Sequence, residues 1–482
     1  MPFIFSPPRY ISQRHCGYCN GKKTDHYALE SQKKQAQLSD PDSIIIGTSI
    51  TEMSCSDYDE LINQGFRRSG TFLYKPDMLR TCCRYYTIRT DMSQLKLTKQ
   101  HRKVVNRFIK AISENNEEPQ HKNQKEYDLT GLLQAESKSK RFYTRYETSE
   151  FTPEKFALYK KYQISVHNDK PEEVTEASFD RFLCETPFPD EEIDGSSEEW
   201  DFLDSWIKNW KPSQKVQYDH SRKRRIGPTH ECYYLDDKLI AISVLDFLPT
   251  GVSSIYFIWD PDYAHLSLGT LSGLREILMC RELSLGYYYL GYYIDDCPKM
   301  NYKSKFGGEL LDLVNEVYVP LSLAKPWIAN DRLFVLGREE ELENEQVEYG
   351  LDNDGHPLSL ENSRFASDEV VNIAEKVYGE DAIFEKARTA MHILITKHEM
   401  APQDKNSPYT IPEVMPGLIP LWKIVDMFET GVLSDTFPVS IIMSGRLQRL
   451  SLGKLNDVGR QLVIDCARLF GPRKIRQGIL NI

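Results

Sequence analysis

The chain has 482 residues, of which 40% are hydrophobic, and at roughly 100–200 residues per domain it is long enough for two or three globular domains. Its 60 Lys and Arg are outnumbered by 71 Asp and Glu, which gives a net charge of −11, so any nucleic-acid binding must depend on local clusters of basic residues. No apolar segment approaches the roughly 20 residues that span a bilayer, and the start, MPFIFSPPRYISQRH, lacks the apolar core of a signal peptide. We therefore expect a cytoplasmic protein with no membrane partner, and the nucleus is a second possible compartment.

The first motif is a set of paired cysteines, which predicts a metal site. Cys16 and Cys19 are separated by two residues in CGYC, and Cys82 and Cys83 are adjacent in CCRYYTIR. In a reducing compartment such spacing favours metal binding over disulfides. Two adjacent ligands strain a tetrahedral zinc site, whereas an iron–sulfur cluster accommodates irregular spacing more easily, so both cofactors stay open. Histidines that could replace one cysteine on zinc are His15, His26 and His101. In the alternative interpretation, some cysteines are simply small buried residues.

Basic residues gather at two places that could bind tRNA phosphates. The first is an acid-free stretch, predicted as a helix from Lys96 to Ile112, and the second precedes a predicted hairpin. The candidate tRNA-binding residues are Lys96, Lys99, Arg102, Lys103, Arg107, Arg222 and Arg224. Clustered Lys and Arg supply the salt-dependent part of nucleic-acid affinity, although both clusters could also be ordinary solvated surface.

The central part of the chain predicts an order of strand, strand, strand, helix, strand. His230–Leu235 and Leu239–Phe247 are apolar runs joined by a short polar turn, and Ile255–Trp259 is a third run that Pro261 ends. Leucines recur at helical spacing from Leu268 to Leu278, and the aromatic run Tyr287–Ile294 follows. Upstream, apolar residues from Phe156 to Tyr162 predict an amphipathic helix.

This order is analogous to the middle of Gcn5-related (GNAT) acetyltransferases, in which two splayed strands hold an activated acyl group. Acetyl-CoA enzymes of that class place a glycine-rich loop before the helix to cradle pyrophosphate. Here that loop is AHLSLGT, in which Gly269 is the single glycine, so we expect no acetyl-CoA.

Five segments resemble one narrower family. They are CGYC, CCRYYTIR, LYKKYQISVHND from Leu158, GPTHECYYLDDKLIAISVLDFLPTGVSSIYFIWDPDYAHLSLG from Gly227 and YYYLGYYIDDCPKMNYK from Tyr287. Together they closely resemble the arginyl-tRNA–protein transferase family, fungal type. The family moves arginine from arginyl-tRNA to proteins that begin with Asp, Glu or oxidised Cys, which marks them for ubiquitin-dependent degradation. The resemblance therefore implies arginyl-tRNA, acceptor proteins with an acidic N-terminus and ubiquitin-ligase machinery as partners. One departure is Glu231, which follows His230 where the family usually has Gln.

The reaction suggests roles for polar residues around the predicted cleft. A neutral α-amine attacks an activated ester, so alignment and electrostatics are the main requirements. The catalytic candidates are His230, Tyr256, Asp260 and Tyr292. The candidates for binding the arginyl group or the acidic acceptor are Glu231, Asp246, Ser267, Arg275, Lys299 and Lys303. Structural roles remain open for each of them: hydrogen bonding for the histidine, turn capping for Asp260, core packing for the tyrosines and surface ion pairing for the cations.

We predict an α+β fold: a GNAT-type mixed sheet with flanking helices, plus a small amino-terminal cysteine-metal domain. The expected ranges are a cysteine-rich domain with the basic helix at 1–112, a polar linker at 113–140, the transfer domain at 141–335, and an acidic loop with a mainly helical region at 336–482. Helical periodicity in the last range covers Val370–Val377, Ile383–Lys397 and Leu455–Leu469. The alternative functions are an acetyl-CoA-dependent N-acetyltransferase and a noncatalytic metal-finger RNA-binding adaptor.

Overall fold

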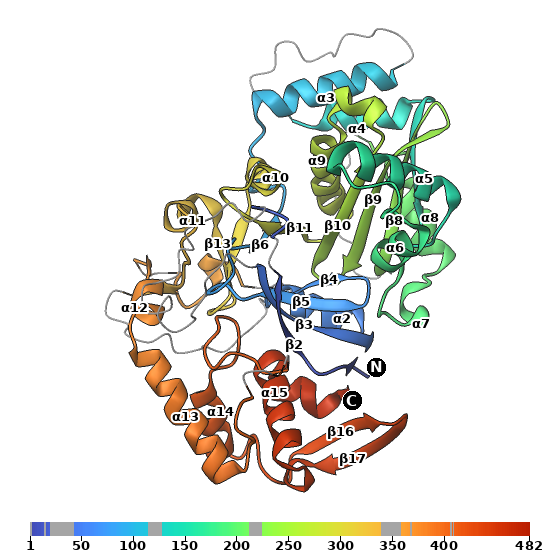
Figure 1. The fold of residues 1–482 in the computed structure, drawn as a ribbon. Coiled ribbons are helices and arrows are strands. Elements are labelled where there is room, and N and C mark those ends of the chain that lie inside the picture. The colour runs from blue at the N-terminus through green and yellow to red at the C-terminus, as the bar shows by residue number, and fades with distance from the viewer. Residues whose placement is uncertain are drawn as a thin grey trace. The chain divides into compact units, whose positions relative to one another are not determined.

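The computed structural model describes residues 2–13, 16–19, 43–113, 128–211, 224–338, 358–366, 369–404, 407 and 409–482. These residues form two compact units, each assembled from segments that are distant in the sequence (Figure 1). Unit 1 comprises Met1–Thr87, Tyr292–Tyr302 and Glu309–Ile482. Unit 2 comprises Ile88–Gly291 and Lys303–Gly308. The chain therefore leaves unit 2 after Gly291, contributes eleven consecutive residues, Tyr292–Tyr302, to unit 1, and returns at Lys303.

Unit 1 contains a sheet in which the first and last strands of the chain are neighbours. Its strands follow the order β17–β16–β18–β1–β3–β5–β4, and β2 also pairs with β3. Their bounds are β1 (Ile4–Phe5), β2 (Arg9–Gln13), β3 (Ser43–Glu52), β4 (Arg67–Ser69), β5 (Phe72–Pro76), β16 (Pro438–Met443), β17 (Arg446–Ser451) and β18 (Ile479–Asn481). Parallel pairing of β1 with β18 places Ile4 opposite Ile479. Strand β1 has only two residues, and it lies between β18, from the end of the chain, and β3, from its beginning. Strands from both ends of the chain therefore hold β1 in the sheet.

The remaining elements of unit 1 are mostly helices of its carboxy-terminal part. The helices are α2 (Cys55–Ile62), α10 (Pro298–Asn301), α11 (Leu321–Ile328), η5 (Leu360–Asn362), α12 (Ala374–Tyr378), α13 (Ala382–His398), α14 (Leu421–Glu429), η6 (Leu452–Lys454) and α15 (Asp457–Gln477). Strand β12 (Glu309–Asp312) is antiparallel to β13 (Val317–Pro320), and β14 (Leu336–Gly337) and β15 (Val371–Asn372) form a two-stranded antiparallel sheet. The helices predicted from Ile383 and from Leu455 are confirmed as α13 and α15. The Val370–Val377 prediction was only partly right, because β15 takes its first residues.

Unit 2 is built around a mixed sheet. The strands that lie wholly or mostly in unit 2 are part of a longer sheet and follow the order β6–β11–β10–β9–β8–β7. Their bounds are β6 (Tyr86–Thr90), β7 (Phe142–Glu147), β8 (Gly227–Leu235), β9 (Lys238–Leu248), β10 (Gly251–Trp259) and β11 (Tyr287–Tyr293). The predicted hairpin is confirmed as β8 and β9, which Asp236 and Asp237 connect with φ values of 50° and 60°. Two left-handed residues are the signature of a type I′ turn, whose twist suits a hairpin. Strands β10 and β11 are parallel, as a strand–helix–strand crossover requires.

Helices cover both faces of the unit 2 sheet (Figure 1). They are α3 (Lys99–Ile112), α4 (Thr130–Lys138), α5 (Pro153–Tyr162), η1 (Gln163–His167), α6 (Glu176–Phe179), η2 (Asp180–Cys184), α7 (Asp190–Ile193), α8 (Ser197–Ser205), η3 (Pro261–Leu266), α9 (Leu268–Glu282) and η4 (Tyr302–Phe306). Side chains alternate between the faces of a strand. Ile242 accordingly packs in a core with Leu158 of α5, whereas the next residue, Ser243, donates a hydrogen bond to Glu276 of α9. The α5 face and the α9 face of this sheet are therefore distinct environments.

The observed architecture confirms an α+β protein with mixed sheets, helices and an amino-terminal cysteine cluster. The boundaries of the two units differ from those of the four consecutive ranges predicted from the sequence. The basic helix α3, which was expected within 1–112, belongs to unit 2, and the carboxy-terminal region belongs to unit 1 with the cysteines. Residues 114–127 of the predicted linker and 339–357 of the predicted acidic loop lie outside the described residues. Within the described ranges, no helix is both long enough and apolar enough to cross a membrane.

Candidate functional site

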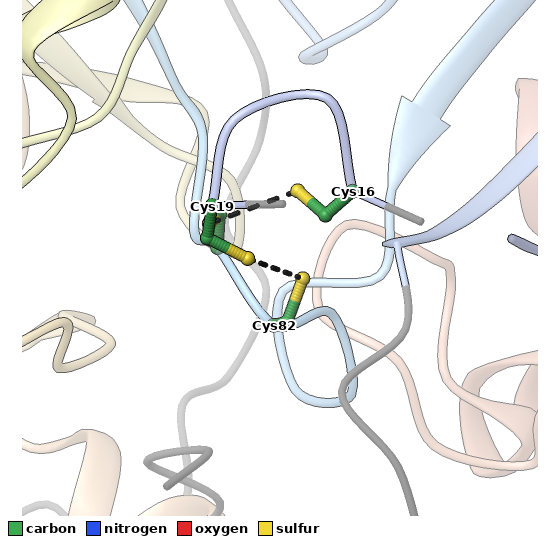
Figure 2. A group of neighbouring side chains, drawn as sticks. Cys16, Cys19 and Cys82 are labelled. Carbon is green, nitrogen blue, oxygen red and sulfur yellow. Dashed lines mark hydrogen bonds between the residues drawn. The ribbon is translucent and has the colours of Figure 1, made fainter. Parts of the chain in front are cut away.

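The four predicted cysteines converge in unit 1. Cys16 and Cys19 lie on one turn, and Cys82 and Cys83 on the loop between β5 and β6. The Sγ atoms of Cys16 and Cys83 are 3.8 Å apart, and those of Cys19 and Cys82 are 3.7 Å apart. All four sulfur atoms lie within 4.8 Å of one another, and Figure 2 shows three of these side chains converging. Adjacent cysteines can thus serve one centre here, because the loop turns both side chains inward.

The geometry of this cysteine cluster fits a single tetrahedral metal ion. Zinc–thiolate bonds of about 2.3 Å place tetrahedral sulfur atoms about 3.8 Å apart, which matches the two short sulfur–sulfur distances. Hydrogen bonds from Cys82 and Cys83 hold the pKa of the Cys16 thiol well below its usual value, and the thiolate is the form that binds metal. Of the histidines considered as replacements, His101 lies in unit 2, where it caps α3, and His15 and His26 lie outside the described residues.

An apolar shell surrounds the cysteine cluster. It includes Tyr85, Tyr292, Ile294 and Cys297, all buried. Tyr292, a predicted catalytic residue, donates a hydrogen bond from its hydroxyl to the Gly65 carbonyl at 2.8 Å. This places the Tyr292 side chain beside the cysteines in unit 1. Lys299, on α10 in the same segment, is exposed.

In unit 2, strands β10 and β11 pair over only three residues and then separate. The pairing runs from Gly251↔Tyr287 to Ser253↔Tyr289, and the register of β10 against β9 shifts directly afterwards, between Ser254 and Tyr256. A bulge of this kind bends a strand and re-aims its side chains. The opening between β10 and β11 therefore begins after Ser253 and Tyr289.

Polar groups gather where this opening begins. Lys303 is 8% exposed, and a β-carbon added to Gly291 would lie 3.8 Å from its Nζ and 4.0 Å from the Ser254 carbonyl oxygen. Asp246, which is fully buried, stands opposite Ser253 across the β9–β10 ladder. The Ser253 hydroxyl is also fully buried, and it has no hydrogen-bond partner among the described residues. A buried hydroxyl without a partner is costly unless a ligand or water satisfies it.

Tyr256 lies just beyond the bulge on the α5 face. Its hydroxyl contacts two residues of the π-helix η1: Gln163 Oε1 at 2.9 Å and His167 Nε2 at 3.1 Å. The sequence analysis did not single out either partner as a site residue, although both lie in the segment LYKKYQISVHND, which carried part of the resemblance. A π-helix turn is rare and often occurs at functional sites. A helical pattern in the sequence does not reveal it.

His230, a predicted base, is fully buried and hydrogen-bonded inside the protein. Its Nε2 lies 3.0 Å from the Ser149 hydroxyl and 3.0 Å from the Leu183 carbonyl oxygen. Burial, with a smaller contribution from the charge of Lys155, lowers its pKa to about 3. The imidazole is therefore neutral at cellular pH, and it is a far weaker base than an exposed histidine.

Glu231 and Arg275, two predicted substrate-binding residues, are paired with each other. Arg275 NH1 lies 2.6 Å from Glu231 Oε1, and Arg275 Nε lies 2.9 Å from Glu136 Oε1. All three side chains are at most 2% exposed, and Tyr146 also donates to Glu231 at 2.8 Å. Arg275 is thus paired with two carboxylates, those of Glu136 and Glu231. This pairing explains a Glu at position 231, because the Gln that the family usually has there would remove one of the two negative charges beside Arg275.

Asp260 caps the short helix η3, as its alternative interpretation allowed. It accepts from the Asp262 backbone at 3.0 Å, and it pairs with Lys161 at 2.5 Å and Lys238 at 2.8 Å. Hydrogen bonds from the two lysines outweigh its burial and lower the pKa of the Asp260 carboxyl. Its charge is therefore satisfied within the protein.

Helix α3 presents its predicted cations beside the start of α9. Lys99, Lys103 and Arg107 recur every four residues on its exposed face, and they line a cavity of about 510 Å³ together with Ser267. Arg107 NH2 donates to Ser267 Oγ at 3.3 Å. Lys96 is exposed ahead of the helix, and Arg102 and Arg224 are half-buried. Arg222 lies outside the described residues.

Comparisons with known proteins identify two family models along the chain. "Arginine-tRNA-protein transferase, N terminus" matches residues 14–103, and "Arginine-tRNA-protein transferase, C terminus" matches residues 154–312. These ranges contain all four cysteines, α5 from its second residue, β8 to β11, and Lys303.

Similar proteins occur in several organisms. The chain is 39% identical over 485 residues to arginyl-tRNA–protein transferase 1 of Saccharomyces cerevisiae, which covers 95% of this chain and 93% of the relative. The Drosophila melanogaster protein of the same name is 27% identical over 64% of this chain and 80% of its own length. An aspartate/glutamate leucyltransferase of Campylobacter jejuni is 38% identical over 87 residues, which are 18% of this chain and 36% of the relative.

Proposed function

The chain belongs to the arginyl-tRNA–protein transferase family, and from that premise we propose which acceptors the enzyme takes and where unit 2 carries out the transfer. The protein is an aminoacyltransferase that uses arginyl-tRNA and protein substrates. The observation that carries this conclusion is the 39% identity to the yeast enzyme over 95% of the chain, because a match of that length includes both units.

The proposed acceptors are proteins whose first residue is Asp, Glu or oxidised Cys. A bacterial relative named for aspartate and glutamate as acceptors shares an 87-residue region with this chain, although its name gives a different amino acid as donor. A shared region is expected if the two enzymes recognise the acceptor in the same way. In this proposal arginylation takes place in the cytoplasm or nucleus and directs proteins to the ubiquitin-ligase machinery.

The chemistry needs little beyond alignment and charge stabilisation. The donor is an activated ester, and the α-amine, with a pKa of about 7.7–8.0, is partly neutral at cellular pH. The nitrogen lone pair attacks the ester carbonyl, the new C–N bond replaces the C–O bond to the ribose, and a proton passes from nitrogen to the departing oxygen. Holding the amine against the carbonyl, with donors near the developing oxyanion, supplies most of the acceleration in such reactions.

The transfer site we propose is the opening between β10 and β11, as in the GNAT-type arrangement. The short parallel pairing and the bulge that follows Ser254 support this location, and so does the buried hydroxyl of Ser253, for which the described part of the chain provides no hydrogen-bond partner. Asp246, on the face shared with Ser253, is the proposed carboxylate for the arginyl guanidinium, because a planar cation pairs well with carboxylate. In this scheme, supporting roles are taken by His230, Glu231, Arg275, Asp260 and Tyr292, through the hydrogen bonds and ion pairs described above.

Lys303 is the proposed cation for the acidic side chain of the acceptor. Its ammonium approaches the backbone of Gly291 and Ser254, where the two strands separate. Of the three predicted cations of the acceptor site, Lys303 is the one whose position beside Gly291 and Ser254 supports this role.

The proposed tRNA contact is the exposed face of α3. Lys99, Lys103 and Arg107 align beside Ser267, so a phosphodiester in that cavity would meet three cations and a hydroxyl. Such contacts hold the tRNA through its phosphates and shape, independently of sequence.

The proposed metal is a single zinc ion on Cys16, Cys19, Cys82 and Cys83. Four sulfur atoms within 4.8 Å suit one ion, whereas a cluster that contains several irons and bridging sulfides holds its thiolates farther apart. The ion would stabilise unit 1 by linking two distant loops, and no step of the transfer involves it.

The decisive experiment measures transfer of labelled arginine from charged tRNA to peptides that begin with Asp, Glu or Ala. We expect labelling of the Asp and Glu peptides and little labelling of the Ala peptide. Labelling with acetyl-CoA instead would favour an N-acetyltransferase, and tRNA binding without any transfer would favour an RNA-binding adaptor. Equal transfer to all three peptides would contradict the proposed acceptor specificity.

A further inference from the structure

The π-helix η1 brings two polar side chains to one hydroxyl. It follows α5 without a break and ends at His167, and the next residue, Asn168, caps it with a φ of 61°. Gln163 and His167, at the two ends of this single turn, both reach the Tyr256 hydroxyl, at 2.9 and 3.1 Å. Tyr256 is half-buried, and the rings of Tyr162 and Phe182 pack edge-on against it at centroid distances of 6.1 and 5.3 Å. The Tyr256 ring is therefore packed against aromatic rings, while its hydroxyl contacts the two polar side chains.

The hydrogen bonds in this group have a defined direction. The Gln163 amide nitrogen donates to Asp169 Oδ2 at 3.0 Å, so its carbonyl oxygen is the atom that faces Tyr256. A carbonyl oxygen can only accept, so Tyr256 donates its single proton to Gln163. His167 must then be the donor in its own bond to Tyr256, through a protonated Nε2. The order of donation is therefore His167 to Tyr256 to Gln163 to Asp169.

This direction determines what Tyr256 can offer a ligand. Its proton is used by Gln163 and one lone pair accepts from His167, so what remains is acceptor capacity. Within the described residues no third partner contacts the hydroxyl. A group that binds there must therefore be an N–H or O–H donor. Because Tyr256 follows the bulge at which β10 leaves β11, that donor would lie next to the separated strands.

We propose that the Tyr256 hydroxyl accepts a hydrogen bond from the attacking α-amino group of the acceptor protein, and that His167 and Gln163 are positioning residues that keep this hydroxyl an acceptor. The inference rests on the proposed function and deepens it. A neutral amine has two N–H groups and one lone pair, so it can donate one N–H to Tyr256 and still direct the lone pair at the ester carbonyl. The arginyl guanidinium, as a cation, is better matched by the carboxylate of Asp246.

The test uses Tyr256→Phe, His167→Leu, His167→Gln and the double variant Tyr256→Phe/His167→Leu in the full chain. Tyr256→Phe should lower kcat/KM for an Asp-initiated peptide roughly 10-fold and change the Kd of arginyl-tRNA by less than about 2-fold. His167→Leu should show a similar loss, and His167→Gln, which keeps an N–H donor, should recover most of it. Tyr234→Phe is the matched control, because it removes a hydroxyl from the same core at a residue of β8 outside the group formed by Tyr256, η1 and Asp169, and it should stay fully active.

The double variant separates positioning from general stability. If His167 acts through the Tyr256 hydroxyl, the double variant should be no slower than Tyr256→Phe alone, whereas two independent structural losses would multiply. Multiplying losses, full activity of Tyr256→Phe, or weakened arginyl-tRNA binding with unchanged peptide kinetics would each overturn the inference. A wild-type chain that transfers no arginine at all would instead refute the proposed function.

Discussion

The charged residues inside unit 2 show how strongly a side chain's role depends on its partners. From the sequence, Arg275 is a candidate for binding the substrate, because it is a cation near the predicted cleft. In the structure it is buried and paired with the carboxylates of Glu136 and Glu231. Nearby Glu276 is buried too, and burial together with the charge of Glu231 raises its pKa to about 8, so it is largely protonated at neutral pH. Lys303 is also largely buried, and its ammonium lies near the backbone of Gly291 and Ser254, where β10 and β11 separate.

Replacing Lys303 tests acceptor recognition at a single residue. A charge-assisted hydrogen bond contributes about 1.5–3 kcal/mol, so Lys303→Met should lower kcat/KM for an Asp-initiated peptide roughly 10- to 150-fold. Affinity for arginyl-tRNA, measured by filter binding, should hardly change. The exposed Lys305→Met variant, two residues away on η4, is the control for loss of a charge in this segment. Full activity of Lys303→Met on Asp and Glu peptides would remove Lys303 from the site.

His230 gives a prediction about pH. Its pKa of about 3 in the folded protein lies below the roughly 6.5 of an unfolded histidine, so the folded state binds fewer protons between these values. Its contribution to stability is therefore complete above about pH 6.5 and declines as the pH falls towards 3. By pH 5 the loss should be about 2 kcal/mol.

The measurement compares urea denaturation of the wild-type chain and His230→Gln at pH 7.5 and 5. The stability advantage of the wild type should shrink by about 2 kcal/mol at the lower pH. His392→Gln, which removes an exposed histidine on α13, controls for the loss of a surface imidazole. A constant difference between wild type and His230→Gln at both pH values would show that His230 does not lose protons on folding.

At the level of elements, helix α3 follows the sequence closely. Thr98 caps it through the His101 backbone, and Val104, Val105 and Phe108 are buried, so the cations between them face outward. The periodicity of 3.6 residues per turn is enough to separate these two faces. It does not reveal that Ser267, from a loop 160 positions beyond Arg107, completes the cavity.

Changing Lys99, Lys103 and Arg107 together to Gln should weaken binding of arginyl-tRNA and make it less dependent on salt. Each lost phosphate contact reduces the slope of log K against log salt by about 0.7–0.9, so three contacts should reduce it by about 2–3. A triple Gln variant of the exposed Lys138, Lys208 and Lys211 carries the same charge change in unit 2 and should keep the wild-type slope. Equal slopes for all three proteins would make the α3 face ordinary surface.

At the level of the whole molecule, unit 1 is held together by contacts between distant parts of the chain. The β1–β18 pair joins residues 4 and 479, and Lys474 of α15 pairs with Asp57 of α2 at 2.8 Å. The cysteine cluster adds a link between two loops that are more than 60 residues apart, and it packs against Tyr292 and Ile294. Metal binding should therefore stabilise segments well beyond the cysteines.

Cys83→Ser should lose the bound metal and loosen unit 1. We expect the metal-to-protein ratio to fall from about one to near zero, because a site with three thiolates binds zinc far more weakly. Hydrogen exchange of residues 292–302 should accelerate, while exchange of β8 and β9 in unit 2 should hardly change. Cys184→Ser, a substitution in unit 2 outside the cluster, is the control. Unchanged metal content in Cys83→Ser would refute the site.

The sequence by itself determined the local features of this protein. The β8–β9 hairpin, β10, α9 and α3 follow from apolar periodicity and turn residues, and the paired cysteines pointed to the cysteine cluster, because these signals depend on neighbours along the chain. Only the tertiary structure decided which of the predicted polar site residues are used inside the protein. It neutralised Arg275, buried His230, joined Tyr256 to Gln163 and His167, and assembled unit 1 from both ends of the chain. Such outcomes depend on contacts between residues far apart in the sequence, and the pattern of a single segment carries no record of them.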